Sequence, residues 1–261
     1  MSNMLALEFE SACSIRRESE GLTEPSGLAL APDGSLWTVC DESRRLFRIS
    51  TEGEPLSTLE IDNRGLEGIT FDAEGRVCVV DEDASKIIVY DPQTGAQIAA
   101  RKLKDLEGFC AIAEYFEAVE NKGLEGITFD PLRSEILLLK QANPGLLIAI
   151  TARLDRITAV DHLDERNGFA ANKLDAEQLN FSGMCYDAAR DLFWILNDKA
   201  ECVYTYDRRR GTVIQSFALK NSQTGRTIRD AEGIAVDVES KRLYVVSDLD
   251  AELNVFRIGE R

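Results

Sequence analysis

A short unit built around a glycine occurs five times along the chain, and this repetition constrains the fold more than any other feature. The copies occupy residues 25–29, 66–72, 124–130, 181–187 and 231–237, with their glycines at Gly27, Gly68, Gly126, Gly183 and Gly233. Successive glycines are therefore 41, 58, 57 and 50 residues apart. Periods of this length are typical of propellers and solenoids and argue against a doubly wound fold.

Each copy is followed by the same succession of segments. A turn rich in Asp, Gly or Pro leads to a second apolar run, polar residues lead to a third, and four copies show a weaker fourth run. Short β-rich runs separated by such turns indicate antiparallel strands, and four-stranded units repeated radially make a β-propeller. We predict a single all-β domain over residues 1–261, a five-bladed β-propeller whose blades are four-stranded and antiparallel. Its blades span about 22–62, 65–104, 123–163, 180–220 and 230–258.

The fifth unit ends after its third strand. An open blade edge would expose unpaired backbone groups, and residues 4–15 have the pattern of a strand. We therefore predict that this N-terminal strand completes the last blade and closes the ring. Residues 105–122 are predicted as an inserted loop with a helical turn over 110–119, and 164–177 as a long connector. Strands within these two segments would make six blades, which is the alternative.

The composition limits the partners and the compartment. Asp and Glu number 46 against 30 Lys and Arg, a formal charge of −16, which argues against nucleic acid or an anionic membrane as the partner. The N-terminal residues do not have the pattern of a secretory signal. Six cysteines occur without a C-x-x-C pair, and His162 is the single histidine. We therefore expect a cytoplasmic monomer with reduced thiols and without zinc.

The repeats predict an acidic face on the propeller. The entry to the first strand of a blade and the exit from its second lie on the same face. The residues before the five glycines are Ser26, Glu67, Glu125, Ser182 and Glu232, and they are expected at the rim of the central channel. The second strands end at Asp41-Glu42, Asp81-Glu82, Lys140-Gln141, Asn197-Asp198 and Ser247-Asp248.

Three glutamates converging on one axis repel one another unless a cation or protonation neutralises them. A set of carboxylate, amide and hydroxyl oxygens favours calcium over zinc. We predict Ca²⁺ bound by Glu67, Glu125 and Glu232, with a small-molecule or cationic ligand at the channel contacted by Glu42, Glu82, Lys140, Asn197 and Asp248. In the alternative interpretation the glutamates are structural, with water and Lys140 satisfying their carboxylates.

Two further residue types have structural interpretations. Asp72, Asp130, Asp187 and Asp237 each stand four residues after a repeat glycine, and we expect them to cap the first turn of each blade on the opposite face. Lys140 interrupts the acidic pattern, and we favour a counterion for the glutamates over a substrate-binding cation.

The chain resembles the SdiA-regulated β-propeller family. The resemblance spans about residues 23–258 and rests on the five glycine units, especially 123–127 and 231–237, and on segments 140–144 and 245–248. The Glu-Gly-Ile units are also similar to the family described as phytase with esterase-like activity. These motifs imply a propeller fold and no particular reaction.

Two classes of function follow from this sequence. A metal-binding propeller that acts as a ligand-binding or interaction module is favoured, because no His, Ser or Cys nucleophile is placed by a motif. The alternative is a calcium-dependent hydrolase of a small ester, lactone or phosphoester. Its metal would polarise the substrate, and Asp41, Asp81 or Asp198 would act as the base.

Overall fold

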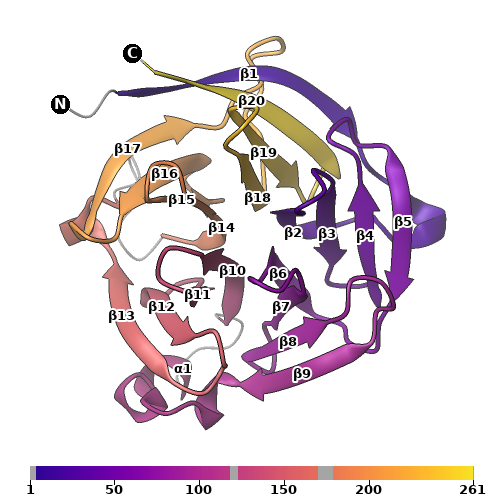
Figure 1. Ribbon diagram of the computed structural model, residues 1–261. Coiled ribbons are helices and arrows are strands. Elements are labelled where there is room, and N and C mark those ends of the chain that lie inside the picture. The colour runs from indigo at the N-terminus through magenta and orange to yellow at the C-terminus, as the bar shows by residue number, and fades with distance from the viewer. Residues whose placement is uncertain (1–3, 118–122, 170–178, 261) are drawn as a thin grey trace.

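The protein is a ring of five four-stranded antiparallel sheets arranged about one axis (Figure 1). The computed structural model describes residues 4–117, 123–169 and 179–260. The predicted five-bladed propeller is confirmed, and the six-bladed alternative is wrong, because the described parts of both long connectors contain no further sheet strand.

Each blade runs from an inner strand beside the axis to an outer strand at the perimeter. Blade 1 contains β2 (Pro25–Leu30), β3 (Leu36–Cys40), β4 (Arg45–Ile49) and β5 (Pro55–Glu60). Blade 2 contains β6 (Leu66–Phe71), β7 (Val77–Asp81), β8 (Lys86–Tyr90) and β9 (Gln97–Lys102). Blade 3 contains β10 (Leu124–Asp130), β11 (Glu135–Lys140), β12 (Gly145–Thr151) and β13 (Ile157–Leu163). Blade 4 contains β14 (Phe181–Asp187), β15 (Leu192–Asn197), β16 (Cys202–Asp207) and β17 (Thr212–Ala218). Blade 5 contains β18 (Ala231–Asp237), β19 (Arg242–Ser247), β20 (Glu252–Glu260) and β1 (Leu5–Ser14).

The two ends of the chain close the ring within blade 5. Strand β1 pairs antiparallel with β20, so that Leu5 lies opposite Glu260 and Ser14 opposite Glu252 (Figure 1). The Gln215 side chain of β17 ties blade 4 to this strand, because its Oε1 accepts from the Leu5 N–H at 2.7 Å and its Nε2 donates to the Leu5 carbonyl at 3.2 Å. The N-terminal strand therefore supplies the missing outer strand, as predicted.

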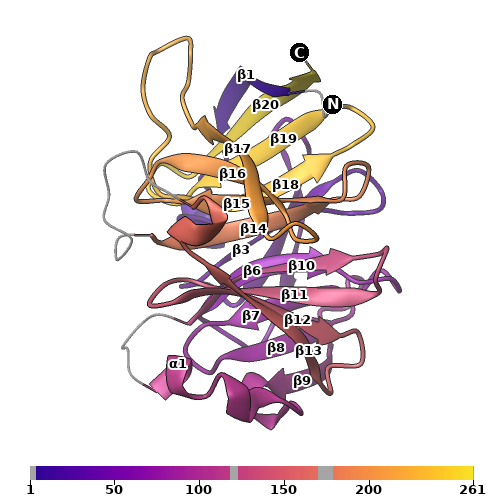
Figure 2. The same ribbon diagram turned by 90° about the vertical axis from the view of Figure 1, so that its left-hand side faces the viewer.

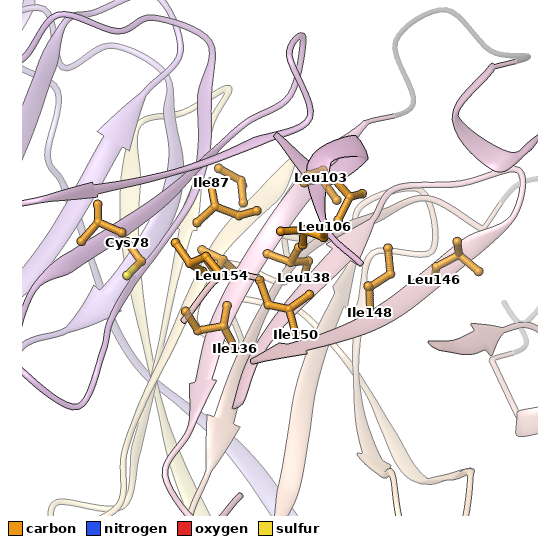
Figure 3. Packing of buried hydrophobic residues seen from close by; sticks show 14 of the residues in the cluster. Cys78, Ile87, Leu103, Leu106, Ile136, Leu138, Leu146, Ile148, Ile150 and Leu154 are labelled. Carbon is orange, nitrogen blue, oxygen red and sulfur yellow. The ribbon is translucent and has the colours of Figure 1, made fainter. Parts of the chain in front are cut away.

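Hydrophobic cores lie between neighbouring blades. On β11, Ile136 and Leu138 pack towards blade 2, whereas Leu137 and Leu139 pack towards blade 4. This follows from the two-residue period of a strand. Figure 3 shows the core between blades 2 and 3, to which the inserted segment adds Leu103 and Leu106. Because both faces of the central strands are buried, their sequences are apolar almost throughout.

The inserted segment covers the perimeter between β9 and β13 (Figure 2). It contains short helices η2 (Leu103–Asp105), η3 (Phe109–Ala111) and α1 (Glu114–Glu117), and residues 118–122 of the predicted loop lie outside the described residues. Glu107 hydrogen-bonds to the backbone of Asp155 and Ile157, both at 2.9 Å, so it partly protects the edge of blade 3. Short helices η1 (Glu18–Glu20) and η4 (Glu165–Asn167) follow β1 and β13.

The turns at the opposite face have the predicted aspartate caps. Each aspartate accepts a hydrogen bond from the backbone N–H two residues ahead, at 2.9–3.1 Å: Asp72 from Glu74, Asp130 from Leu132, Asp187 from Ala189 and Asp237 from Glu239. These residues therefore stabilise the hairpins of the inner strands.

All six cysteines are free thiols. Three are buried, Cys13 and Cys202 are half-buried, and Cys110 is exposed. Within the described ranges, no helix has the length and apolar character needed to cross a bilayer.

Closure by β1 has a measurable consequence. Deleting residues 1–13 should expose the β20 edge and the apolar surface that Phe9 covers on Phe256, whose ring centroid lies 5.6 Å away. We expect a lower melting temperature and aggregation, measured by scanning fluorimetry and light scattering. Deleting residues 1–3 is the control, and unchanged melting of the longer deletion would contradict the closure.

Candidate functional site

Each inner strand has a β-bulge, and in four of the five blades the side chain at the bulge lines one cavity. The inner and second strands lose register around the residue before the repeat glycine, between Leu124 and Gly126 in blade 3 and between Ala231 and Gly233 in blade 5. The same irregularity occurs in the other three blades. Bulges redirect side chains, and this explains how Glu67, Glu125 and Glu232 come to line a common cavity.

The glycines after the bulges let the inner strands approach one another. A Cβ atom on Gly27 would lie 2.2 Å from the Glu67 carbonyl oxygen, and one on Gly183 would lie 1.9 Å from that of Glu232. The five inner strands contact one another in a closed ring. The repeat glycine therefore reflects close backbone packing around the axis.

The acidic cavity at the mouth of the channel has a volume of about 230 Å³. Its lining consists of Glu24, Ser26, Asp41, Glu67, Glu82, Glu125, Gln141, Glu232 and Asp248. Seven of these nine residues carry carboxyl groups, and none is a lysine, arginine, histidine or cysteine. The predicted convergence of the three glutamates with Asp41 and Asp248 on one face is observed.

The outer part of the lining comes from the residue directly after the second strand of a blade. This position is occupied by Asp41, Glu82, Gln141, Asp198 and Asp248, and all except Asp198 line the cavity. Asp81, Lys140 and Asn197 are one residue earlier, at the ends of their strands, opposite Leu66, Leu124 and Phe181. Since side chains alternate along a strand, these three residues point away from the axis.

The side chains of Asp81 and Asn197 form local contacts at the ends of their strands. Asp81 accepts from the Ala84 N–H at 2.9 Å and pairs with Lys86 at 2.8 Å. Asn197 Oδ1 accepts from the Ala200 N–H at 2.9 Å.

Asp198 is also directed away from the cavity. It is held by Asn180 Nδ2 at 2.7 Å and by Lys199 Nζ at 2.9 Å. Of the three candidate bases, only Asp41 therefore lines the cavity.

Lys140 lies outside the lining as well. Its ammonium donates to the carbonyls of Ala142 and Pro144 and lies 5.5 Å from the centre of the Phe116 ring. Lys140 is almost fully buried, with 1% of its surface exposed. It thus stabilises the turn after β11 and contacts the inserted segment, whereas the sequence interpretation placed it among the glutamates.

The positions of Glu42 and Glu24 both differ from the prediction. Glu42 points into a separate groove, whereas Glu82 and Asp248 line the cavity as predicted. The contribution of Glu24 was missed. Its position two residues before Ser26, on the approach to an inner strand, is the signal that identifies it.

Burial and mutual repulsion hold the glutamates in the protonated form. Burial, followed by the charges of Asp41 and Glu82, raises the pKa of Glu67 to about 8. Burial and the charge of Glu67 raise the pKa of Glu232 to about 9, and the same two causes place that of Glu125 well above its usual range. Glu125 also hydrogen-bonds to Glu82.

The pKa values of the two aspartates in the lining are raised as well. Burial, followed by the charge of Glu24, raises the pKa of Asp248 to about 6, and burial raises that of Asp41. The metal-free cavity therefore carries less negative charge than its seven carboxyl groups would give if all were ionised.

Two oxygen atoms of the lining residues have no hydrogen-bond partner within residues 4–117, 123–169 and 179–260. They are Gln141 Oε1 and Asp248 Oδ1, and both atoms are buried. Buried acceptors without a partner are rare and point to water or a ligand. Among the described residues, no three His, Cys, Asp or Glu side chains lie close enough together to hold a metal ion. The calcium assignment therefore stays a prediction.

The sequence of the whole propeller matches a known family. The model of the SdiA-regulated family aligns with residues 3–256. The chain belongs to the SdiA-regulated family.

Solved structures with the same architecture include a glutaminyl cyclase of Myxococcus xanthus. It is 13% identical, with a TM-score of 0.67, over 98% of this chain and 97% of the cyclase. The PQQ-bound aldose sugar dehydrogenase of Streptomyces coelicolor is 12% identical, with a TM-score of 0.54, over 98% of this chain and 99% of the dehydrogenase. At these identities the likeness concerns the fold alone.

The close approach of the inner strands predicts the effect of adding one methyl group. Gly183→Ala should destabilise the protein by about 1–3 kcal/mol or more, since the new Cβ would overlap the Glu232 carbonyl. Urea denaturation measures the change. Gly259→Ala is the matched control because its Cβ would lie 3.6 Å from Ala6, an ordinary contact. Equal effects of the two changes would contradict the packing argument.

The pKa shifts predict how stability depends on pH. The pKa values of Glu67 and Glu232 rise on folding from 4.5 to about 8 and about 9, so the folded protein binds more protons than the unfolded chain between these limits. The stability that these two groups contribute is therefore nearly complete at pH 5, falls progressively as the pH rises, and is lost by about pH 8 to 9.

Glu67→Gln, which mimics the protonated form, should stabilise the metal-free protein at pH 9 by at least about 1.4 kcal/mol relative to pH 5, the equivalent of one pKa unit. Chemical denaturation at both pH values measures this difference. Glu60→Gln, at a side chain with 86% of its surface exposed, should show no such difference. An equal response of the two variants would refute the assignment.

Proposed function

We propose that this propeller is a cation-binding module whose acidic cavity takes up Ca²⁺ and, through it or beside it, a small ligand. The observation that supports this most is the convergence of seven carboxyl-bearing residues, among them Glu67, Glu125 and Glu232, on one cavity whose lining contains no basic side chain. A cation would relieve the repulsion among the glutamates.

The donor set suits a hard cation. Carboxylate, amide and hydroxyl oxygens line the cavity without nitrogen or sulfur ligands, and such oxygens are the ligands of calcium. Glu67, Glu125 and Glu232 would hold the ion, and the volume of about 230 Å³ leaves room for a cation that retains several water molecules.

The arrangement favours binding over hydrolysis. A hydrolase needs a base in reach of its substrate, and Asp81 and Asp198 are both engaged in ion pairs away from the cavity. Asp41 is the remaining candidate, and its Oδ1 accepts from the Glu42 N–H at 2.6 Å. The structure thus offers fewer groups for catalysis than for ligand binding.

Calcium should stabilise the folded protein by mass action. At a hundredfold excess over the dissociation constant the gain is about 2.7 kcal/mol, which corresponds to a rise in melting temperature of roughly 5–10 °C for a chain of this size. Scanning calorimetry of chelator-treated protein, with and without calcium, measures it. Magnesium should do less because it resists dehydration.

Two double variants distinguish calcium binding in the cavity from a general effect of surface charge. Glu67→Gln with Glu125→Gln should abolish the calcium increment, whereas Glu54→Gln with Glu239→Gln, two exposed positions, should preserve it. If calcium and chelator leave the melting of the unaltered protein unchanged, the proposal is wrong.

A further inference from the structure

A second hollow lies beside the acidic cavity, between blades 1 and 2. This groove has a volume of about 760 Å³ and is lined by residues from 18–23, 42–45 and 60–64, by Tyr90 and by 95–97. Two chain segments contribute to both hollows. Thr23 lines the groove and Glu24 the cavity, while Asp41 lines the cavity and Glu42 the groove. Since consecutive Cα atoms are about 3.8 Å apart, the two hollows adjoin at these segments.

Three arginines line this groove, whereas none lines the cavity. Arg45 is engaged, because it donates to the Glu20 carbonyl and lies 3.7 Å from Glu60. Arg44 and Arg64 are exposed, and their guanidinium groups form no hydrogen bond or ion pair with any residue in the described ranges. Both guanidinium groups are therefore open to a ligand from the groove.

The backbone fixes these two arginines on adjoining segments. The Ile61 N–H donates to the Arg44 carbonyl at 2.9 Å, and the Gly65 N–H donates to the Asp41 carbonyl, also at 2.9 Å. Arg44 and Arg64 therefore project from two segments that are hydrogen-bonded to each other. Planar guanidinium groups from neighbouring segments are suited to grip the oxygens of a phosphate or carboxylate group.

The acidic residues of the groove limit what can bind. Glu60 lies near Arg45, and Glu18, Glu42 and Asp62 are exposed at the lining. Their charges are screened by solvent and salt, but they disfavour a ligand with several negative charges. Ser19 and Ser43 also line the groove. The Ser43 hydroxyl donates to the Cys40 carbonyl at 3.3 Å, so the Ser19 hydroxyl is the neutral donor for the remainder of a ligand.

We propose that this groove is a binding site for a small molecule with one anionic oxygen group, a phosphate monoester or a carboxylate, received by Arg44 and Arg64. The site needs no cation in the channel. The anionic group of the ligand lies against the two guanidinium groups, and its neutral or cationic part extends towards the acidic cavity.

Two probes with the same ring separate the two anionic groups. Phenyl phosphate and benzoate are titrated by calorimetry and ligand-observed NMR into the full-length protein with chelator present. At least one probe should bind, and Arg44→Gln or Arg64→Gln should each weaken that probe about tenfold. The double variant should lose about a hundredfold. The identity of the stronger probe assigns the group as a phosphate or a carboxylate.

A matched change elsewhere controls for general charge. Arg226→Gln removes an exposed arginine from the connector between β17 and β18 and should leave probe binding unchanged. The proposal is overturned if neither probe binds, or if the double variant binds as tightly as the unaltered protein. Calcium titration of the double variant tests the channel separately, so a failure of calcium binding is distinguishable from a failure of this site.

Discussion

The close approach of five inner strands around one axis is the constraint on which the rest of this structure depends. At Gly27 and Gly183 the backbone of the next blade occupies the space that a Cβ atom would need. The preceding residue cannot remain in the regular ladder, and it forms a bulge that directs its side chain towards the axis. The same feature of the sequence therefore explains both the narrow ring and the residues that line its mouth.

The convergence of carboxyl groups on the axis is electrostatically unfavourable, because no basic side chain of the lining offsets their repulsion. Glu67, Glu125 and Glu232 are brought together with four further carboxyl groups and no basic side chain in the lining. Burial and repulsion raise their pKa values, so protons neutralise part of the cavity. Under the proposed function, a cation would replace these protons and relieve the repulsion among the carboxyl groups.

The five blades do not contribute equally to the cavity. Blade 4 has Ser182 at the bulge, and its hydroxyl donates to the Ala231 carbonyl at 2.6 Å, while Asp198 is held away by Asn180 and Lys199. Acidic groups thus come from the other four blades. Beside them, the groove between blades 1 and 2 differs from the cavity because arginines line it together with carboxylates.

The sequence alone was sufficient for the fold, because a repeat with a fixed succession of apolar runs and turns has few ways to bury its strands. The number of blades, the closure by the N-terminal strand, the turn aspartates and the three convergent glutamates all follow from it. The sequence could not assign the residues at the ends of the second strands, because a shift of one position reverses the direction of a side chain. Asp81, Lys140 and Asn197 therefore point away from the cavity, whereas Gln141 lines it together with Glu82 and Asp248, the two that the sequence had placed there. The contribution of Glu24 to the cavity, and the pairing of segments that places Arg44 and Arg64 in the lining of one groove, arise only from tertiary contacts, which local sequence patterns do not encode.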